Sequence, residues 1–260
     1  MSVNIAVSYN VFDNEELLED SILNIRDHVE KITVVYQKIS NFGNKCDPQL
    51  EDFLYSLREM KLIDQLVLFK TNLSNDPETN ERKKNNLGYF LSLKNGADYH
   101  MGMACDEFYF KEDILNLKDM LSQYPVDLVT SYMYTYYKTS NYRFAEVEDY
   151  VVPILNKVVD DGRQNLLGGP MPLLIDPTRR MKYDSCFCFP KTKPLMHHLS
   201  HVRKDFRKKL INSTANKNWY DKIDAMCEHY DNWTPGQDAF LHGEYIKLEK
   251  TDIFKKEIIF

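Results

Sequence analysis

The chain has 260 residues, of which 43% are hydrophobic and 28% are charged, and its formal net charge is -6. This composition is typical of a globular protein with a full apolar core, and the negative charge argues against a general nucleic-acid-binding surface. No apolar run approaches the length of a membrane span, and five cysteines without CxxC spacing indicate neither a disulfide framework nor a zinc site, so a cytoplasmic location is expected.

Apolar runs alternate with amphipathic segments through the first half of the chain. Strands are expected at 3–9, 31–37, 65–70 and 99–105, and helices at 14–29, 48–60 and 81–94. Strands that alternate with helices in this way predict a mainly parallel sheet with right-handed crossovers.

The fourth expected strand ends in two carboxylates, Asp106 and Glu107. The helix before it has a stop signal in Asn95 and Gly96, because glycine accepts the left-handed conformation that closes a helix. Ligands of open α/β sheets bind at the carboxyl ends of strands, where paired carboxylates can hold a divalent cation against phosphate oxygens. The alternative is a polar strand end with two solvated acids.

The second half of the chain has a different pattern. A helix at 112–123 precedes a tyrosine-rich segment at 126–144 that alternates as a two-faced strand or hairpin would, and a further strand is expected at 185–189. This half is therefore expected to be antiparallel and rich in loops, including one with Gly168 and Gly169. The basic run at 203–209 predicts either a solvated helix face or a phosphate- or acceptor-binding surface.

Three segments together resemble the GT-A nucleotide-sugar glycosyltransferases, especially family-2-like members. They are SYN at 8–10 followed by NEELLEDSI at 14–22, the stretch KKNNLGYFLSLKNGADYHM at 83–101, and ACDEF at 104–108. The last is similar to the DxDEF form of that family's metal-binding motif. The resemblance covers about the first 110 residues, with a weaker similarity near the C-terminus.

The resemblance implies a fold and an activity. The fold is α/β of the Rossmann-like GT-A type: a mainly parallel central sheet flanked by helices, with a mixed or antiparallel C-terminal acceptor portion. One domain over 1–260 would hold a nucleotide-sugar-binding half at 1–110 and an acceptor-binding half at 111–260. The activity is transfer of a sugar from a nucleotide diphosphate sugar, with UDP favoured, to a glycan or other hydroxyl acceptor, with inversion of configuration.

The resemblance also implies a cofactor, Mn²⁺ or Mg²⁺, bound to the donor diphosphate. Asp106 is the expected metal ligand and Glu107 a supporting donor-site residue, with His242 as a late metal ligand. Ala104, however, stands where the family has the first Asp of its motif, so metal binding through fewer acids is expected. A metal-free enzyme could instead neutralise the diphosphate with Arg179 and Arg180.

The remaining site residues follow from strand ends and from positions that match the family. Ser8, Asn10 and Gln37 are expected to contact the nucleotide, and Lys84 and Asn86 match donor-binding positions of the family. Asp238 is the expected general base, because the family often carries an acidic pair on a late helix that faces the donor sugar. His242 follows four residues later, which would place both side chains on one helix face.

Three alternatives compete with this hypothesis. A catalytically degenerate protein that only binds sugar nucleotides would be consistent with Ala104. A sugar-nucleotide nucleotidylyltransferase would need a glycine-rich loop after the first strand, and SYNVFDNEE contains no glycine. A nucleic-acid acceptor is weakly supported, since one basic run in an acidic chain is little basis for it.

Overall fold

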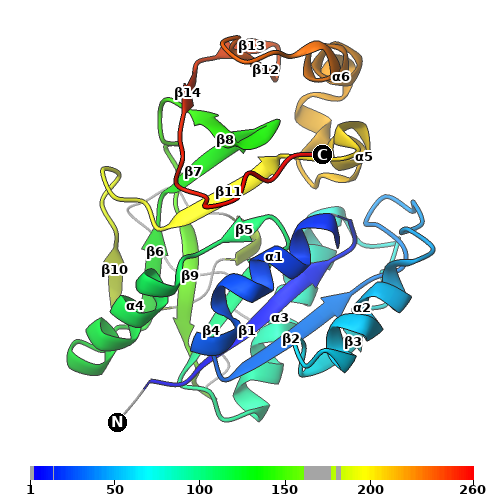
Figure 1. Ribbon diagram of the computed structural model, residues 1–260. Helices are drawn as coiled ribbons and strands as arrows, with labels where there is room; N and C mark the ends of the chain where they lie inside the picture. Colours follow the sequence, from blue (N-terminus) through cyan, green and yellow to red (C-terminus); the bar gives the residue numbers. More distant parts are fainter. Residues whose placement is uncertain (1–2, 14, 161–176, 180–182) are drawn as a thin grey trace.

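The computed structural model describes residues 3–13, 15–160, 177–179 and 183–260. A seven-stranded central sheet, with strand order β10-β6-β9-β4-β1-β2-β3, forms the larger part of the molecule, and a five-stranded sheet lies beside it (Figure 1). Within the described part of the chain, no helix has the length and hydrophobicity needed to cross a membrane.

The central sheet confirms the expected parallel arrangement. Its strands are β1 (Ile5–Val11), β2 (Lys31–Tyr36), β3 (Gln65–Leu68), β4 (Tyr99–Ala104), β6 (Leu128–Ser131), β9 (Val152–Lys157) and β10 (Cys186–Cys188). Strands β4, β1, β2 and β3 pair in parallel, whereas β9 runs antiparallel to both β4 and β6. The connecting helices are α1 (Glu15–Ile25), α2 (Leu50–Glu59), α3 (Pro77–Lys94) and α4 (Lys111–Gln123).

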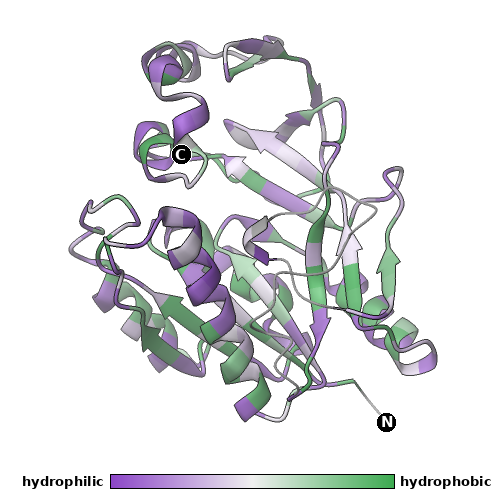
Figure 2. Cartoon of the chain, turned by 180° about the vertical axis from the view of Figure 1, so that it is seen from behind, coloured by the Kyte–Doolittle hydropathy of each residue, from purple (hydrophilic) through white to green (hydrophobic). Residues whose placement is uncertain are grey.

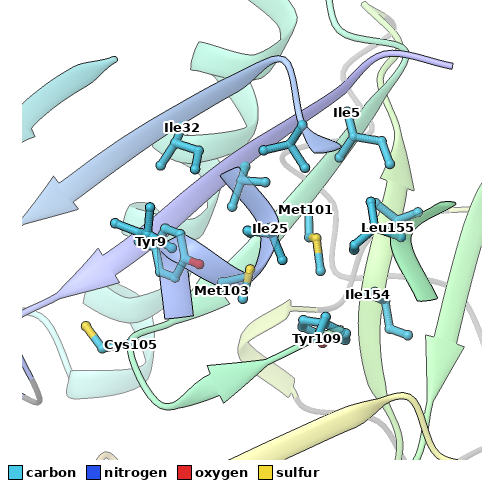
Figure 3. Packing of buried hydrophobic residues seen from close by; sticks show 14 of the residues in the cluster. Ile5, Tyr9, Ile25, Ile32, Met101, Met103, Cys105, Tyr109, Ile154 and Leu155 are labelled. Carbon is cyan, nitrogen blue, oxygen red and sulfur yellow. The ribbon is translucent and has the colours of Figure 1, made fainter. Parts of the chain in front are cut away.

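The core lies on both faces of this sheet. In Figure 1, α1 lies in front of β1 and α3 lies behind it, so side chains of both strand faces are covered. Figure 3 shows Tyr9, Met101, Met103 and Ile154 packed together in the main hydrophobic cluster. Burial on both faces explains why the strand sequences are continuously apolar. In Figure 2, hydrophobic and hydrophilic residues alternate along the helices.

Helix α3 begins earlier than the expected position 81. Asp76 is its N-cap and accepts a hydrogen bond from the Thr79 backbone N–H at 2.8 Å, and Pro77 occupies the first helical position. Pro has no N–H to leave unpaired there, so the two residues together form a strong start signal. The expected C-terminal stop is confirmed, because Gly96 after the C-cap Asn95 has φ of +69°.

One glycine sets how closely α3 packs on the sheet. A Cβ atom built on Gly88 would lie 2.1 Å from the Ser8 Oγ and 2.7 Å from the Ser8 Cβ. Only glycine therefore fits at this crossing of α3 over β1. The same contact places Ser8 beneath the helix.

The second sheet confirms the expected mixed C-terminal half. Its strands are β5 (Glu107–Phe108), β7 (Met133–Tyr137), β8 (Thr139–Phe144), β11 (Met196–His201) and β14 (Leu248–Lys250), in the order β14-β8-β7-β11-β5. The chain passes from the central sheet to this sheet at 104–107, between β4 and β5, and again at 131–133, between β6 and β7. Asp106 therefore lies where the two sheets separate.

The C-terminal part corrects one expectation. It contains α5 (Phe206–Asn212), α6 (Ile223–Asn232) and a hairpin of β12 (Ala239–Leu241) and β13 (Glu244–Ile246). No helix forms at Asp238, because His242 and Gly243 have φ of 56° and 89° and make the two-residue turn of that hairpin. The prediction that Asp238 and His242 share a helix face was wrong.

Candidate active site

A cavity of about 290 Å³ opens at the carboxyl ends of β1, β2 and β4. The strand order changes direction at β1, which pairs with β2 on one side and with β4 on the other. Connections leave such a point toward opposite faces of the sheet and leave a crevice, which is where open α/β sheets bind ligands. The opposite wall comes from β11 and α5, toward which β1 points in Figure 1.

Amide side chains at the strand ends form one wall of the cavity. Asn10, at the end of β1, donates to the Asn85 Oδ1 at 2.6 Å, and Gln37 follows β2 as a buried side chain. Asn41 donates to a Glu81 carboxylate oxygen at 3.3 Å. The Oδ1 of Asn10 and Asn41 and the Oε1 of Gln37 are buried and have no hydrogen-bond partner among the described residues. Buried acceptors without a partner indicate that a ligand or water donates to them.

Three cationic or hydrogen-bonding groups converge on the Asp106 carboxylate. The Arg203 Nη2 pairs with Asp106 Oδ2, the His198 Nε2 lies 3.5 Å from that oxygen, and the Lys209 Nζ lies 3.7 Å from it. Asp106 is 1% exposed and Arg203 is 2% exposed. Burial alone would raise the pKa of Asp106, but Arg203, Lys209 and His198 bring it well below its usual range. The carboxylate is therefore ionised, with Oδ2 facing the cations, while Oδ1 is buried without a hydrogen-bond partner among the described residues.

Glu107 is held by a second arginine. Its Oε2 accepts from the Arg179 Nη1 at 3.0 Å, and its Oε1 pairs with the Arg179 Nη2, so the guanidinium binds the carboxylate through both nitrogens. The same Nη1 also donates to the Gly102 carbonyl at 3.3 Å. This geometry fixes Arg179 on the cavity wall and leaves Glu107 as an anchor for it.

A third ion pair lies on α3. The Lys84 Nζ is 2.9 Å from a Glu81 carboxylate oxygen, and both residues line the cavity. Burial raises the pKa of Glu81, but the neighbouring Lys84 outweighs it and the net pKa is lowered. The cavity therefore carries Lys84, Arg179 and Lys209 on separate walls, which is a suitable arrangement for a multiply charged anion.

Asp13 differs from the other carboxylates of the cavity. Asp106, Glu107 and Glu81 each have an ion-pair partner, whereas Asp13 has none within 4 Å in the described part of the chain. Burial raises the pKa of Asp13, and Lys209 and Arg203 oppose that rise only in part. A carboxylate with a raised pKa and no committed partner can accept a proton.

The acid expected to bind Mn²⁺ or Mg²⁺ keeps one oxygen, Asp106 Oδ1, buried and without a hydrogen-bond partner among the described residues. Among these residues, no group of three or more His, Cys, Asp and Glu side chains could hold a metal ion. Asp106 pairs with Arg203 through Oδ2, and Ala104 supplies no side-chain oxygen. His242 lies in the β12–β13 turn, stacked on Trp219 at 4.6 Å between ring centroids, and does not line the cavity.

The structure brings together part of the predicted site. The predicted residues that line the cavity are Asn10, Gln37, Lys84, Asp106 and Glu107, together with Arg179, which was expected for a metal-free enzyme. Ser8, Asn86, Asp238 and His242 do not line it. Ser8 lies under α3, Asn86 lines a separate small pocket, and Asp238 is exposed, with its carbonyl hydrogen-bonded to the His229 ring at 2.9 Å. Asn14, Gly168, Gly169 and Arg180 lie outside the described residues.

Six site residues were not among the predicted site residues: Asp13, Asn41, Glu81, His198, Arg203 and Lys209. The basic run at 203–209 contains two of them, Arg203 and Lys209, and this run was the sequence signal that could have identified them. Its side chains divide by role, since Arg203 is buried against Asp106 and Lys209 lines the cavity, while Arg207 pairs with Asp224 on the surface. The sequence alone did not show which of the basic residues face inward.

No family model matches the sequence, and no curated protein matches it. Among solved structures, the chain is similar to S. aureus TarS 1-349, with 13% identity over 88% of this chain and 72% of that chain and a TM-score of 0.47. It is also similar to S. aureus TarS 1-349 in complex with UDP-GlcNAc, with 12% identity over 88% of this chain and 73% of that chain and a TM-score of 0.46. A further similar structure is the mannose-1-phosphate geranyltransferase from Thermus thermophilus, with 12% identity over 64% of this chain and 52% of that chain and a TM-score of 0.33. At these scores, function has to be inferred from the cavity itself.

Proposed function

We propose that this protein is a glycosyltransferase that moves a sugar from a nucleoside diphosphate sugar to a hydroxyl acceptor. The observation that carries the proposal is the cavity at the switch point of the parallel sheet, which holds three cationic side chains beside buried amide oxygens without partners among the described residues. A nucleoside diphosphate matches both features, because it combines a multiply charged diphosphate with hydrogen-bond donors on its base and ribose. The motif resemblance in the first 110 residues supports the same donor class.

In this proposal the donor lies along the strand ends. Gln37 and Asn41 accept hydrogen bonds from the base or the ribose, since their buried oxygens lack a partner in the described structure. Lys84, Arg179 and Lys209 face the diphosphate. UDP is the first nucleotide to test, because the motif resemblance favours a UDP-sugar as the donor.

The acceptor side is the wall formed by the second half of the chain. Met133, Tyr150, Val152 and Met196 line the cavity there. Apolar and aromatic side chains of this kind suit the hydrophobic face of a sugar ring.

Asp13 is the proposed general base, in place of Asp238. The acceptor oxygen attacks the anomeric carbon while the bond from that carbon to the diphosphate oxygen breaks, and the diphosphate leaves with the bonding electrons. Asp13 takes the hydroxyl proton, and the cations of the cavity balance the charge of the leaving group. One displacement of this kind inverts the anomeric centre.

Asp13→Asn tests this assignment. Turnover, measured as nucleoside diphosphate release from a panel of nucleotide sugars with glycan acceptors, should fall by about 10²- to 10⁴-fold, because general-base assistance is lost. The affinity for UDP should stay near the wild-type value. Asp238→Asn is the matched control, since Asp238 is exposed and outside the cavity, and it should keep wild-type turnover. The opposite pattern, in which Asp238→Asn loses turnover and Asp13→Asn keeps it, would restore Asp238 as the base.

The second candidate is a protein that binds sugar nucleotides without transferring the sugar. The committed ion pairs of Asp106 and Glu107 favour it, because they remove two acids from possible chemistry. Calorimetric affinity for nucleotide sugars, combined with no release of nucleoside diphosphate to any acceptor or to water, would establish this alternative.

A further inference from the structure

The Asp106 position is where the site departs from the motif that it resembles, and the inference drawn from it rests on the proposed donor. In that motif an acid binds a metal ion, which neutralises the diphosphate. Here the acid itself is surrounded by Arg203, Lys209 and His198, all directed at the same oxygen, Oδ2. Side chains of the protein thus already supply the positive charge that would neutralise the donor diphosphate.

The charges around Oδ2 disfavour a divalent cation at this oxygen. Asp106 faces two permanently charged groups, Arg203 and Lys209, and Asp13 is the other acid whose pKa these two cations lower. The other cations of the cavity, Arg179 and Lys84, are each paired with one carboxylate. A divalent cation on Asp106 would lie within a few ångströms of Arg203 and Lys209 and would be repelled by both.

Lys209 can turn toward a ligand. Its Nζ lies 3.7 Å from Asp106 Oδ2, beyond hydrogen-bond distance, and its side chain is 22% exposed and lines the cavity from α5. Arg203 supports it from behind, because its Nε donates to the Ser200 carbonyl at 2.9 Å and its Nη2 holds Asp106. The Nη1 of Arg203 is buried without a hydrogen-bond partner in the described residues. Arg203 does not line the cavity, so it contributes positive charge next to Lys209 and Asp106 and not direct contact with a ligand.

We infer that the protein neutralises the diphosphate of its donor with Lys209 and Arg203, and that it does so without a divalent cation. Asp106 is a positioning residue that holds these two cations at the carboxyl end of β4. His198 is the third group of the set, and its Nδ1 is likewise buried without a partner among the described residues.

Isothermal titration calorimetry of UDP, with uridine as the uncharged comparison, tests the inference. The wild-type protein should bind UDP with the same Kd in EDTA and in Mn²⁺. Lys209→Met should weaken UDP binding about ten- to a hundredfold, the range of a hydrogen bond to a charged group, and leave uridine binding unchanged. Lys204→Met is the matched control, because Lys204 belongs to the same basic run but is exposed and outside the cavity.

The substitution Asp106→Asn should change UDP binding in opposite directions at a metal site and at a cation cluster. A metal ligand would lose Mn²⁺-dependent UDP binding when its charge is removed. Under the inference, Asp106→Asn should strengthen UDP binding, because a buried negative charge beside Lys209 is removed while the amide oxygen still accepts from Arg203. Thermal unfolding establishes that this variant is folded, and if it is not, the Lys209 comparison decides.

The outcomes separate the inference from the proposed function. UDP binding in EDTA that depends on Lys209 supports both. UDP binding that requires Mn²⁺, or that is unchanged in Lys209→Met, overturns the cation inference and leaves the donor proposal standing. If neither UDP nor GDP, ADP or CDP binds in EDTA or in Mn²⁺, the proposed function fails and the inference fails with it.

Discussion

Single ionisable side chains in this protein are buried in one charge state, and that ties folding stability to pH. His100 and His197 are both buried, and burial, with Arg179 and Arg143 respectively as the smaller cause, lowers the pKa of each to about 3. Both rings are therefore neutral in the folded protein at pH 5, whereas an exposed imidazole in the unfolded chain has a pKa of about 6.5. The unfolded chain binds protons that the folded protein does not bind.

The free energy of unfolding should consequently decrease as the pH falls from about 6.5 toward 3. Each of the two histidines should contribute a loss of about 2 kcal/mol at pH 5 relative to pH 7, from about 1.4 kcal/mol per unit of pKa difference. Urea midpoints of His197→Gln at the two pH values should show a smaller pH dependence than the wild type.

A matched control separates titration from packing. The Tyr136 hydroxyl is 2.7 Å from the His197 Nδ1, so Tyr136→Phe removes that hydrogen bond without removing the imidazole. It should lower stability at both pH values and keep the wild-type pH dependence. If His197→Gln also kept the wild-type pH dependence, the buried imidazole of His197 would not be a source of that dependence. Asp106 does not contribute to the difference between pH 5 and pH 7, because its lowered pKa means that its contribution to stability is lost only below about pH 4.

The packing of α3 against the sheet is tightly constrained, because the helix crosses β1 with no room for a side chain at Gly88. It also carries Lys84 and Glu81 into the cavity, so its distance from the sheet sets the position of one cationic wall. The helix end at Asn95 and Gly96 was readable from the sequence. Its start was not predicted, because Asp76 and Pro77 lie in a polar stretch that has the composition of a loop.

Gly88→Ala should destabilise the protein. Replacing glycine by alanine in a helix gains about 1 kcal/mol of propensity, but the new Cβ would overlap Ser8, and such overpacking costs about 1–3 kcal/mol. Urea unfolding measures the net effect. The double variant Ser8→Gly with Gly88→Ala removes the overlapping atoms and should recover part of the loss. A Gly88→Ala protein at least as stable as the wild type would mean that α3 does not pack this closely.

At the scale of the whole molecule, the sequence predicts the two halves better than it predicts the contacts between them. Uninterrupted apolar runs identify β1, β2 and β4, because strands buried on both faces need them. The late hairpin was mistaken for a helix, since its turn at His242 and Gly243 has no strong sequence signal. The pair of Asp106 and Arg203 joins residues 97 positions apart, and no local pattern specifies such a contact.

The cavity exists because the two sheets separate next to Asp106, and both sides contribute charge to it. The first half of the chain brings amide groups at the strand ends and Lys84 on α3, and the second half brings His198 on β11 and Lys209 on α5. The predicted donor half at 1–110 therefore supplies only part of the proposed donor site. The basic side chains from the second half complete it.

The most direct test of this function is a crystal structure of the protein with UDP, grown in the presence of Mn²⁺. The prediction is that the diphosphate lies in the cavity, with phosphate oxygens about 3 Å from the Nζ atoms of Lys84 and Lys209, and that Asp106 remains paired with Arg203. UDP bound away from the carboxyl ends of β1 and β4 would contradict the donor site, and Mn²⁺ bridging Asp106 and the diphosphate would contradict its metal-free charge balance.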